Sequence, residues 1–173
     1  MNENEYYNKY KEQLDLLKKH IHNDYIYNII LTYKVKKDNE YIKLHSNINI
    51  YEMIFLHSMI KYFKPRKILE IGCAYGISGM VIANALGQYN LGGSLISIDP
   101  YQEKQWSNVG KYNINNVVEY YKNLHNIYIQ HTVLYESSSI ALTKMYKNNE
   151  KYDLIFIDGS HALLDVIVDV FCS

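Results

Sequence analysis

The 173-residue sequence lacks a net charge, because 18 Lys and Arg side chains balance 18 Asp and Glu side chains. It therefore has no global field that would recruit nucleic acid or an anionic membrane. It also lacks an apolar run of about 18 residues and a charged-then-apolar leader, the signs of a membrane helix and of a secretory signal. These absences predict a soluble, cytoplasmic protein without a nucleic-acid or membrane partner.

Cysteine is scarce as well. The two copies, Cys73 and Cys172, have neither CxxC spacing nor neighbouring histidines, so the sequence gives no sign of a zinc site. The sequence leaves open whether the two cysteines form a disulfide, although reduced thiols are the expectation in the cytoplasm. The length suits one compact domain with a single core, and the composition is that of an ordinary globular protein.

The first third of the chain has a helical pattern. Apolar side chains recur at three- and four-residue spacings between Tyr7 and Ile21, and again between Ile26 and Tyr33, which predicts two helices. Residues 36–43 are polar and are expected to form a connection. Asn49 and Glu52 have the spacing of a capping box, which predicts a helix from residue 50 to 60. We assign residues 1–46 to an N-terminal helical extension.

From residue 67 onward the pattern changes to short apolar runs separated by helical stretches. The predicted strands are residues 68–71, 95–98, 127–133 and 154–157. The predicted helices are residues 78–86, 115–124, 140–146 and 163–171. This alternation is typical of βαβ units and predicts an α/β fold with a parallel sheet covered on both faces. We assign residues 47–173 to this domain.

The first strand leads into a glycine-rich turn that reads Glu-Ile-Gly-Cys-Ala-Tyr-Gly-Ile-Ser, from Glu70 to Ser78. Glycines let the backbone bend sharply, and the next helix offers free N–H groups to a carboxylate or phosphate. The dinucleotide fingerprint would need glycines at positions one, three and six. Counted from Gly72, the third position is Ala74 and the sixth is Ile77, so the turn fits an NAD-binding protein poorly.

Carboxylates lie at or just after the carboxyl ends of all four predicted strands. They are Glu70, Asp99, Glu136 and Asp158. The carboxyl ends of parallel strands meet at one edge of the sheet, where such folds bind their ligands. A single acid at a strand end is often only the cap of the next helix. Four in succession, beside a glycine turn, favour a binding site.

Three segments together resemble the small-molecule O-methyltransferase branch of the class I S-adenosylmethionine-dependent methyltransferases. They are residues 68–78, residues 97–102 with Gln105 and Trp106, and residues 152–161, which read Tyr-Asp-Leu-Ile-Phe-Ile-Asp-Gly-Ser-His. The resemblance covers about residues 47–170. It implies a Rossmann-like three-layer sandwich whose sheet begins with strand order 3-2-1-4, and methyl transfer from S-adenosylmethionine to an oxygen of a small-molecule acceptor.

The resemblance also implies roles in binding the cofactor. Gly72 and Gly76 would give it room, Glu70 would lie beneath its methionine end, and Ser78 would meet its carboxylate. Asp99 would hold the ribose. Ser137 and Ser138 would lie near the adenine, although the preceding Glu136 departs from the family's usual Gly-Asp-Ser or Gly-Ala-Ser sequence. Trp106 either covers the adenine or anchors its loop.

Asp158 and His161 are the candidate catalytic residues. In metal-dependent relatives the carboxylate at the position of Asp158 binds a divalent cation such as Mg²⁺, which orients the acceptor. His161 stands where relatives have a base, and imidazole suits proton acceptance near neutral pH. The alternative reading is that Asp158 caps the following helix and that His161 packs in its first turn.

The family's sheet has seven strands, and this sequence supplies the first four. The run from Leu154 to Ile157 would then be an apolar edge strand, which is an open template for pairing. We therefore expect a homodimer or a partner chain at this edge. The sequence leaves open whether the chain is a fragment, a truncated product or a variant completed by a partner. The alternative function is a degenerate, non-catalytic domain that binds the cofactor and acts through assembly.

Overall fold

The computed structural model describes residues 3–45, 48–159, 166 and 169–170. Four strands form a parallel sheet: β3 (Lys67–Ile71), β4 (Gly93–Ile98), β5 (Ile129–Leu134) and β6 (Leu154–Ile157). Their order across the sheet is β5-β4-β3-β6, and every neighbouring pair is parallel. Numbered along the chain, this is the predicted order 3-2-1-4. The α/β class and the sheet order are confirmed.

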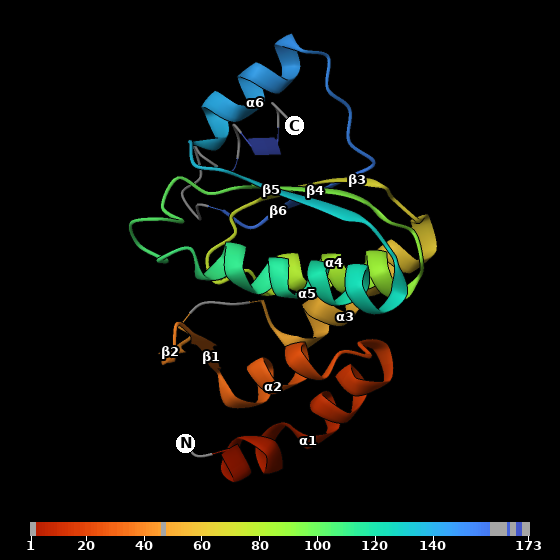
Figure 1. Cartoon of the computed structure of the whole chain (residues 1–173), viewed down its shortest axis with the longest axis vertical. Coiled ribbons are helices and arrows are strands. Elements are labelled where there is room, and N and C mark those ends of the chain that lie inside the picture. Colours follow the sequence, from red (N-terminus) through yellow and green to blue (C-terminus); the bar gives the residue numbers. More distant parts are fainter. Residues whose placement is uncertain (1–2, 46–47, 160–165, 167–168, 171–173) are drawn as a thin grey trace.

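Helices cover both faces of the sheet (Figure 1). On one face lie α3 (Ile50–Phe63), α4 (Ile77–Gln88) and α5 (Val109–His125), and on the other lies α6 (Ser138–Lys147). Alternate side chains of a strand point to opposite faces, so β3 contributes apolar side chains to the hydrophobic clusters on both faces of the sheet. Ile68 joins the core under α4 and α5, whereas Leu69 and Ile71 pack with the apolar side chains of α6.

Two further helices form a layer outside α3 and α4. They are α1 (Glu3–His20) and α2 (Asp24–Thr32). The predicted apolar stripe faces inward, since Leu14, Leu17 and Ile21 are buried and belong to the same core as the sheet. The N-terminal extension therefore shares the hydrophobic core of the sheet domain.

The predicted connection at residues 36–43 is instead part of a hairpin, and the expectation was wrong. Strands β1 (Lys34–Lys37) and β2 (Glu40–Lys43) pair antiparallel. Asp38 and Asn39 form the two-residue loop with φ values of 50° and 67°, which suits the twist of paired strands. The many charged side chains hid the strands, although Val35 is buried.

The helix after the hairpin begins as predicted. The Asn49 side chain accepts from the Glu52 N–H, and the Glu52 carboxylate accepts from the Asn49 N–H, so the capping box is present. The helix continues to Phe63, three residues beyond the predicted end. Helix α5 begins at Val109, six residues before its predicted start. The helix predicted at residues 163–171 lies largely outside the described residues.

No helix in the described part of the chain is long and apolar enough to cross a membrane.

Candidate cofactor-binding site

A cavity of about 800 Å³ opens at the carboxyl ends of the four parallel strands. Each strand contributes the residues that follow it. The lining includes the turn after β3 (residues 71–75, 77 and 78), residues 98–101, 105 and 106 after β4, residues 137–139 after β5, and residues 158 and 159 after β6. The sheet topology thus gathers segments up to 88 residues apart around one space, as expected for an open parallel sheet.

The two glycines of the first turn are required by contacts within the protein. Gly72 has a φ of +91°, and a Cβ atom there would lie 2.2 Å from the main-chain oxygen of Asp158. Gly76 has a φ of +76°, and its Cβ would lie 2.6 Å from the main-chain oxygen of Gly110. Only glycine permits these approaches without strain. Gly72 also lines the cavity, so it shapes the space in which a ligand would lie.

Helix α4 points an uncapped N-terminus at the cavity. Its N-cap, Gly76, has no side chain that could accept a hydrogen bond, and the first two helical residues, Ile77 and Ser78, line the cavity. Free N–H groups at a helix start favour an anion. The Ser78 hydroxyl donates to Oε1 of Glu70 across 2.5 Å. What Ser78 offers to a ligand is therefore its main chain.

Glu70 lies below the cavity floor. Its side chain is fully buried and accepts hydrogen bonds from the hydroxyls of Ser78 and Ser97, each at 2.5 Å. Burial raises the pKa of Glu70 to about 7, although both hydroxyl groups oppose the rise. The contacts of this carboxylate are with the protein.

Asp99 lines the cavity at the end of β4 and is only 5% exposed. Its Oδ2 accepts from the Ala74 N–H at 2.8 Å, and its Oδ1 accepts from the Tyr101 N–H at 2.9 Å. An ionised carboxylate has about four acceptor positions. Asp99 thus holds the glycine turn and keeps capacity to accept from a ligand hydroxyl.

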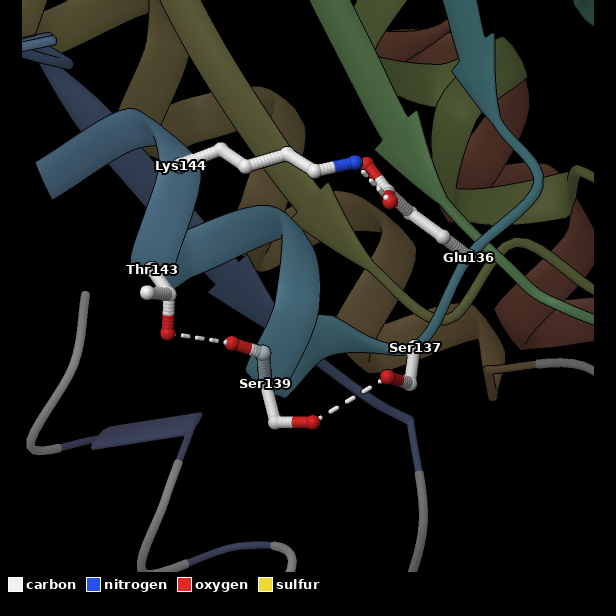
Figure 2. Close-up of polar contacts among 5 residues, drawn as sticks. All are labelled: Glu136, Ser137, Ser139, Thr143 and Lys144. Carbon is white, nitrogen blue, oxygen red and sulfur yellow. Dashed lines mark hydrogen bonds and ion pairs between the residues drawn. The ribbon is translucent and has the colours of Figure 1, made fainter. Parts of the chain in front are cut away.

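The serines after β5 form the opposite side of the cavity. Ser137, Ser138 and Ser139 all line it. Figure 2 shows the hydroxyls of Ser137 and Ser139 meeting at the start of α6, 3.1 Å apart, while Lys144 reaches back to Glu136. The Ser137 hydroxyl does not cap α6, so this helix also presents main-chain N–H groups beside the cavity.

Asp158 lies at the end of β6, on the cavity wall, and is exposed. Its main-chain N–H donates to the oxygen of Ile71 at 2.8 Å, which joins the ends of β6 and β3. His161, the predicted base, lies outside the described residues. Within those residues, no three His, Cys, Asp or Glu side chains come together as a metal site.

A family model described as "Methyltransferase domain" matches residues 69–172, more than half of the chain. The chain belongs to this family. The resemblance to the methyltransferases that was drawn from the sequence is confirmed at the level of this family. No curated protein sequence matches the chain.

The methyltransferase domain is also similar to solved structures. One is the O-methyltransferase from Bacillus cereus, whose crystal structure is a complex with SAH (S-adenosylhomocysteine). The TM-score is 0.50 at 21% sequence identity, and the match covers 73% of this chain and 53% of the Bacillus protein. At this identity the similarity shows a shared fold. The chain spans about half the length of that protein.

The methyltransferase domain contains one organising residue that the sequence patterns did not reveal. Gln102 is fully buried, and its Nε2 donates to the oxygen of Ala74 at 2.8 Å and to Asp99 at 3.1 Å. Its Oε1 accepts from the main-chain N–H groups of Gly110 and Lys111, the second and third residues of α5. In the sequence Gln102 ends the second of the resembling segments, three residues after Asp99, but no pattern predicted these contacts.

Trp106 lies in the loop after β4 and contacts the glycine turn. Its ring meets the ring of Tyr75 edge-to-face, with centroids 5.0 Å apart, and both residues line the cavity. The tryptophan therefore anchors its loop to the glycine turn and also forms cavity wall.

The donor set of the methyltransferase domain fits S-adenosylmethionine. The cofactor has a carboxylate, an ammonium, two ribose hydroxyls and an adenine. The cavity offers a helix N-terminus to the carboxylate, Asp99 to hydroxyl donors, and serine hydroxyls with Trp106 to a heteroaromatic ring. Burial raises the pKa of the Cys73 thiol, so this wall residue stays neutral. Polar groups of the required kinds line one space of sufficient size.

Proposed function

We propose that the domain binds S-adenosylmethionine and transfers its methyl group to an oxygen of a small-molecule acceptor. The observation that carries the proposal is the cavity itself. It joins the uncapped α4 N-terminus, the Asp99 carboxylate and the serines after β5 in chain order along the sheet edge. An elongated ligand with an anionic end, a diol and a base would meet matching groups in that order.

In this proposal the protein mainly binds and positions. The N–H groups at Ile77 and Ser78 hold the methionine carboxylate, and Asp99 accepts from the ribose hydroxyls. Ser137 and Ser138 contact the adenine. When bound, the cofactor supplies a methyl group on a positively charged sulfur. Holding the acceptor in line with that methyl accounts for much of the rate that such a site can achieve.

The acceptor side of the cavity is the β6 corner. Asp158 is exposed there, where it can orient an acceptor hydroxyl and accept its proton. His161 follows three residues later, and we propose it as the alternative base. A divalent cation at Asp158 is a further part of the proposal. The described residues supply no group of three ligands for it. Dialysis against EDTA followed by Mg²⁺ addition tests metal dependence.

Calorimetry with S-adenosylmethionine, SAH and NAD tests the binding proposal. We expect both sulfur-containing ligands to bind more tightly than NAD, because the glycine turn lacks the dinucleotide spacing. Tighter NAD binding would overturn the assignment. SAH release from a panel of small hydroxylated compounds then tests transfer to oxygen, with thiol and amine acceptors of similar size as controls.

A second candidate is a cofactor-binding domain that acts through assembly without catalysis. One observation favours it: β6 is an edge of the sheet that the described residues form. This candidate predicts SAH binding without methyl transfer to any acceptor. Turnover by the purified chain alone would exclude it.

A further inference from the structure

Asp169 stands out among the residues that line the cavity. It is 1% exposed, and its Oδ1 atom is buried without a hydrogen-bond partner. Asp99 and Glu70 are also buried, but each accepts at least two hydrogen bonds from the protein. Buried carboxylates are normally paired, because an unpaired charge away from water is costly. Oδ1 of Asp169 is therefore an acceptor that the protein itself leaves unsatisfied.

Asp169 belongs to the part of the cavity between the ends of β3 and β6. Gly159, which also lines the cavity, marks the place. A Cβ atom at Gly159 would lie 3.7 Å from Oδ2 of Asp169 and 3.6 Å from the main-chain oxygen of Ile71. Oδ2 of Asp169 and the Ile71 oxygen thus lie near each other at the cavity wall, and the Ile71 oxygen already accepts one hydrogen bond, from the Asp158 N–H. A group with several N–H donors and a positive charge suits that point.

The glycine turn brings an anion-binding element into the same cavity. Ile71 immediately precedes this turn, which leads into the uncapped N-terminus of α4 at Ile77 and Ser78. A helix start favours a carboxylate, whereas Asp169 favours a cation. The amino-acid end of S-adenosylmethionine carries both groups on one carbon atom. A cavity with an anion site and a cation site is complementary to that zwitterion.

We propose that Asp169 binds the ammonium group of the cofactor's amino-acid end. The inference rests on the proposed function. Neutralising a buried carboxylate on binding means that the apo domain carries an electrostatic cost that the ligand relieves. Removing the charge of Asp169 should therefore stabilise the domain without ligand and lower its affinity for the ligand.

Asp169→Asn tests this assignment, because the side chain keeps its shape and loses its charge. The matched control is Glu119→Gln, the same loss of charge at an exposed position on α5. Calorimetry uses two ligands: SAH, which has the ammonium, and 5′-methylthioadenosine, which keeps the adenosine and sulfur but lacks the amino-acid end. Thermal melts of the three ligand-free proteins monitor the fold.

For Asp169→Asn we expect the Kd of SAH to rise about tenfold or more, the size of a lost hydrogen bond between charged groups. The Kd of 5′-methylthioadenosine should change less than about twofold, and the apo melting temperature should not fall. Glu119→Gln should match the parent with both ligands.

Three results would overturn the assignment. The first is an unchanged Kd for SAH, which leaves the proposed function intact. The second is an equal loss of affinity for SAH and 5′-methylthioadenosine, which means that the substitution disturbs the whole cavity. The third is a loss of affinity for S-adenosylmethionine while the affinity for SAH is unchanged, which means that Asp169 faces the sulfonium. If the parent itself binds neither S-adenosylmethionine nor SAH, the proposed function fails first and this inference with it.

Discussion

Ser78 donates its hydroxyl proton to Glu70 across 2.5 Å, and the pair joins the first turn of α4 to strand β3. Ser97 donates to the other oxygen of the same carboxylate from β4. Glu70 therefore fixes the start of α4 relative to two strands, and so fixes where the helix N-terminus points. Its effect on a ligand is indirect, through the position of the main-chain N–H groups.

Glu70→Gln should change how stability depends on pH. The pKa of Glu70 rises from 4.5 to about 7 on folding, so the folded protein holds a proton that the unfolded chain releases between these values. Stability from this group is thus present at low pH and lost as pH rises through about 7. At about 1.4 kcal/mol per pKa unit, the loss is about 3 kcal/mol above pH 8.

Chemical denaturation of parent and Glu70→Gln between pH 4 and 9 measures this effect. The variant's stability relative to the parent should increase as the pH rises from about 4.5 to 7 and then level off. Glu119→Gln, at an exposed site, should show no such rise. A constant difference between Glu70→Gln and the parent would mean that folding does not change the pKa of Glu70.

Asp99→Ala should lower both cofactor affinity and stability. It removes the acceptor for the Ala74 and Tyr101 N–H groups, and hydrogen bonds to a charged group contribute about 1.5–3 kcal/mol each. Calorimetry with SAH and a thermal melt separate the two effects. A lower melting temperature with unchanged SAH affinity would show that Asp99 only shapes its loop.

Gln102→Leu should destabilise the domain although it adds apolar surface. The N–H groups of Gly110 and Lys111 would lose the side chain that caps α5, and Asp99 would lose a donor. Loss of a helix cap costs about 0.5–2 kcal/mol, and the other lost bonds add to it. The exposed Gln105→Leu is the control. Equal denaturation midpoints for the two variants would contradict the capping role.

Gly72→Ala and Gly159→Ala form a matched pair at the cavity. The first adds a methyl group 2.2 Å from the Asp158 oxygen at a φ of +91°, whereas the nearest atom at Gly159 is a flexible Ile71 methyl at 3.3 Å. We expect Gly72→Ala to cost several kcal/mol, or to prevent folding, because the backbone cannot yield cheaply. Gly159→Ala should cost about 1 kcal/mol or less. Similar melting temperatures would show that the turn adapts.

The edge position of β6 gives a prediction about assembly. Leu154 to Ile157 are all half-buried, and the strand pairs with β3 on one side within the described sheet. An apolar edge is a template for another strand. We propose that the chain self-associates there, and Ile155→Lys should reduce the effect by placing a charge at the edge. Light scattering at tens of micromolar (about 50 µM) should show dimers or larger species. A monomer would contradict the proposal.

The sequence was sufficient where local chemistry decides the structure. Asn49 and Glu52 carry a complete capping signal within four residues. The four apolar runs that form the parallel strands end at or near acidic residues, which mark the carboxyl ends of the sheet. The glycine turn and Asp99 are likewise read from adjacent residues. The hairpin at residues 34–43 was missed because charged side chains dominate strands that are held by the loop at Asp38 and Asn39.

Other features depend on side-chain contacts that the spacing of residues does not encode, and only the tertiary structure decided them. Helix α5 starts early because Gln102, in the loop that leads into it, folds back and caps its first turn. The Ser78 hydroxyl donates to Glu70 instead of pointing into the cavity, because β3 and α4 meet beneath the turn. Asp169 reads as an ordinary helix residue until burial places it in the cavity wall without a partner. Composition and spacing determine which elements form, whereas packing determines which polar groups are satisfied and which remain for a ligand.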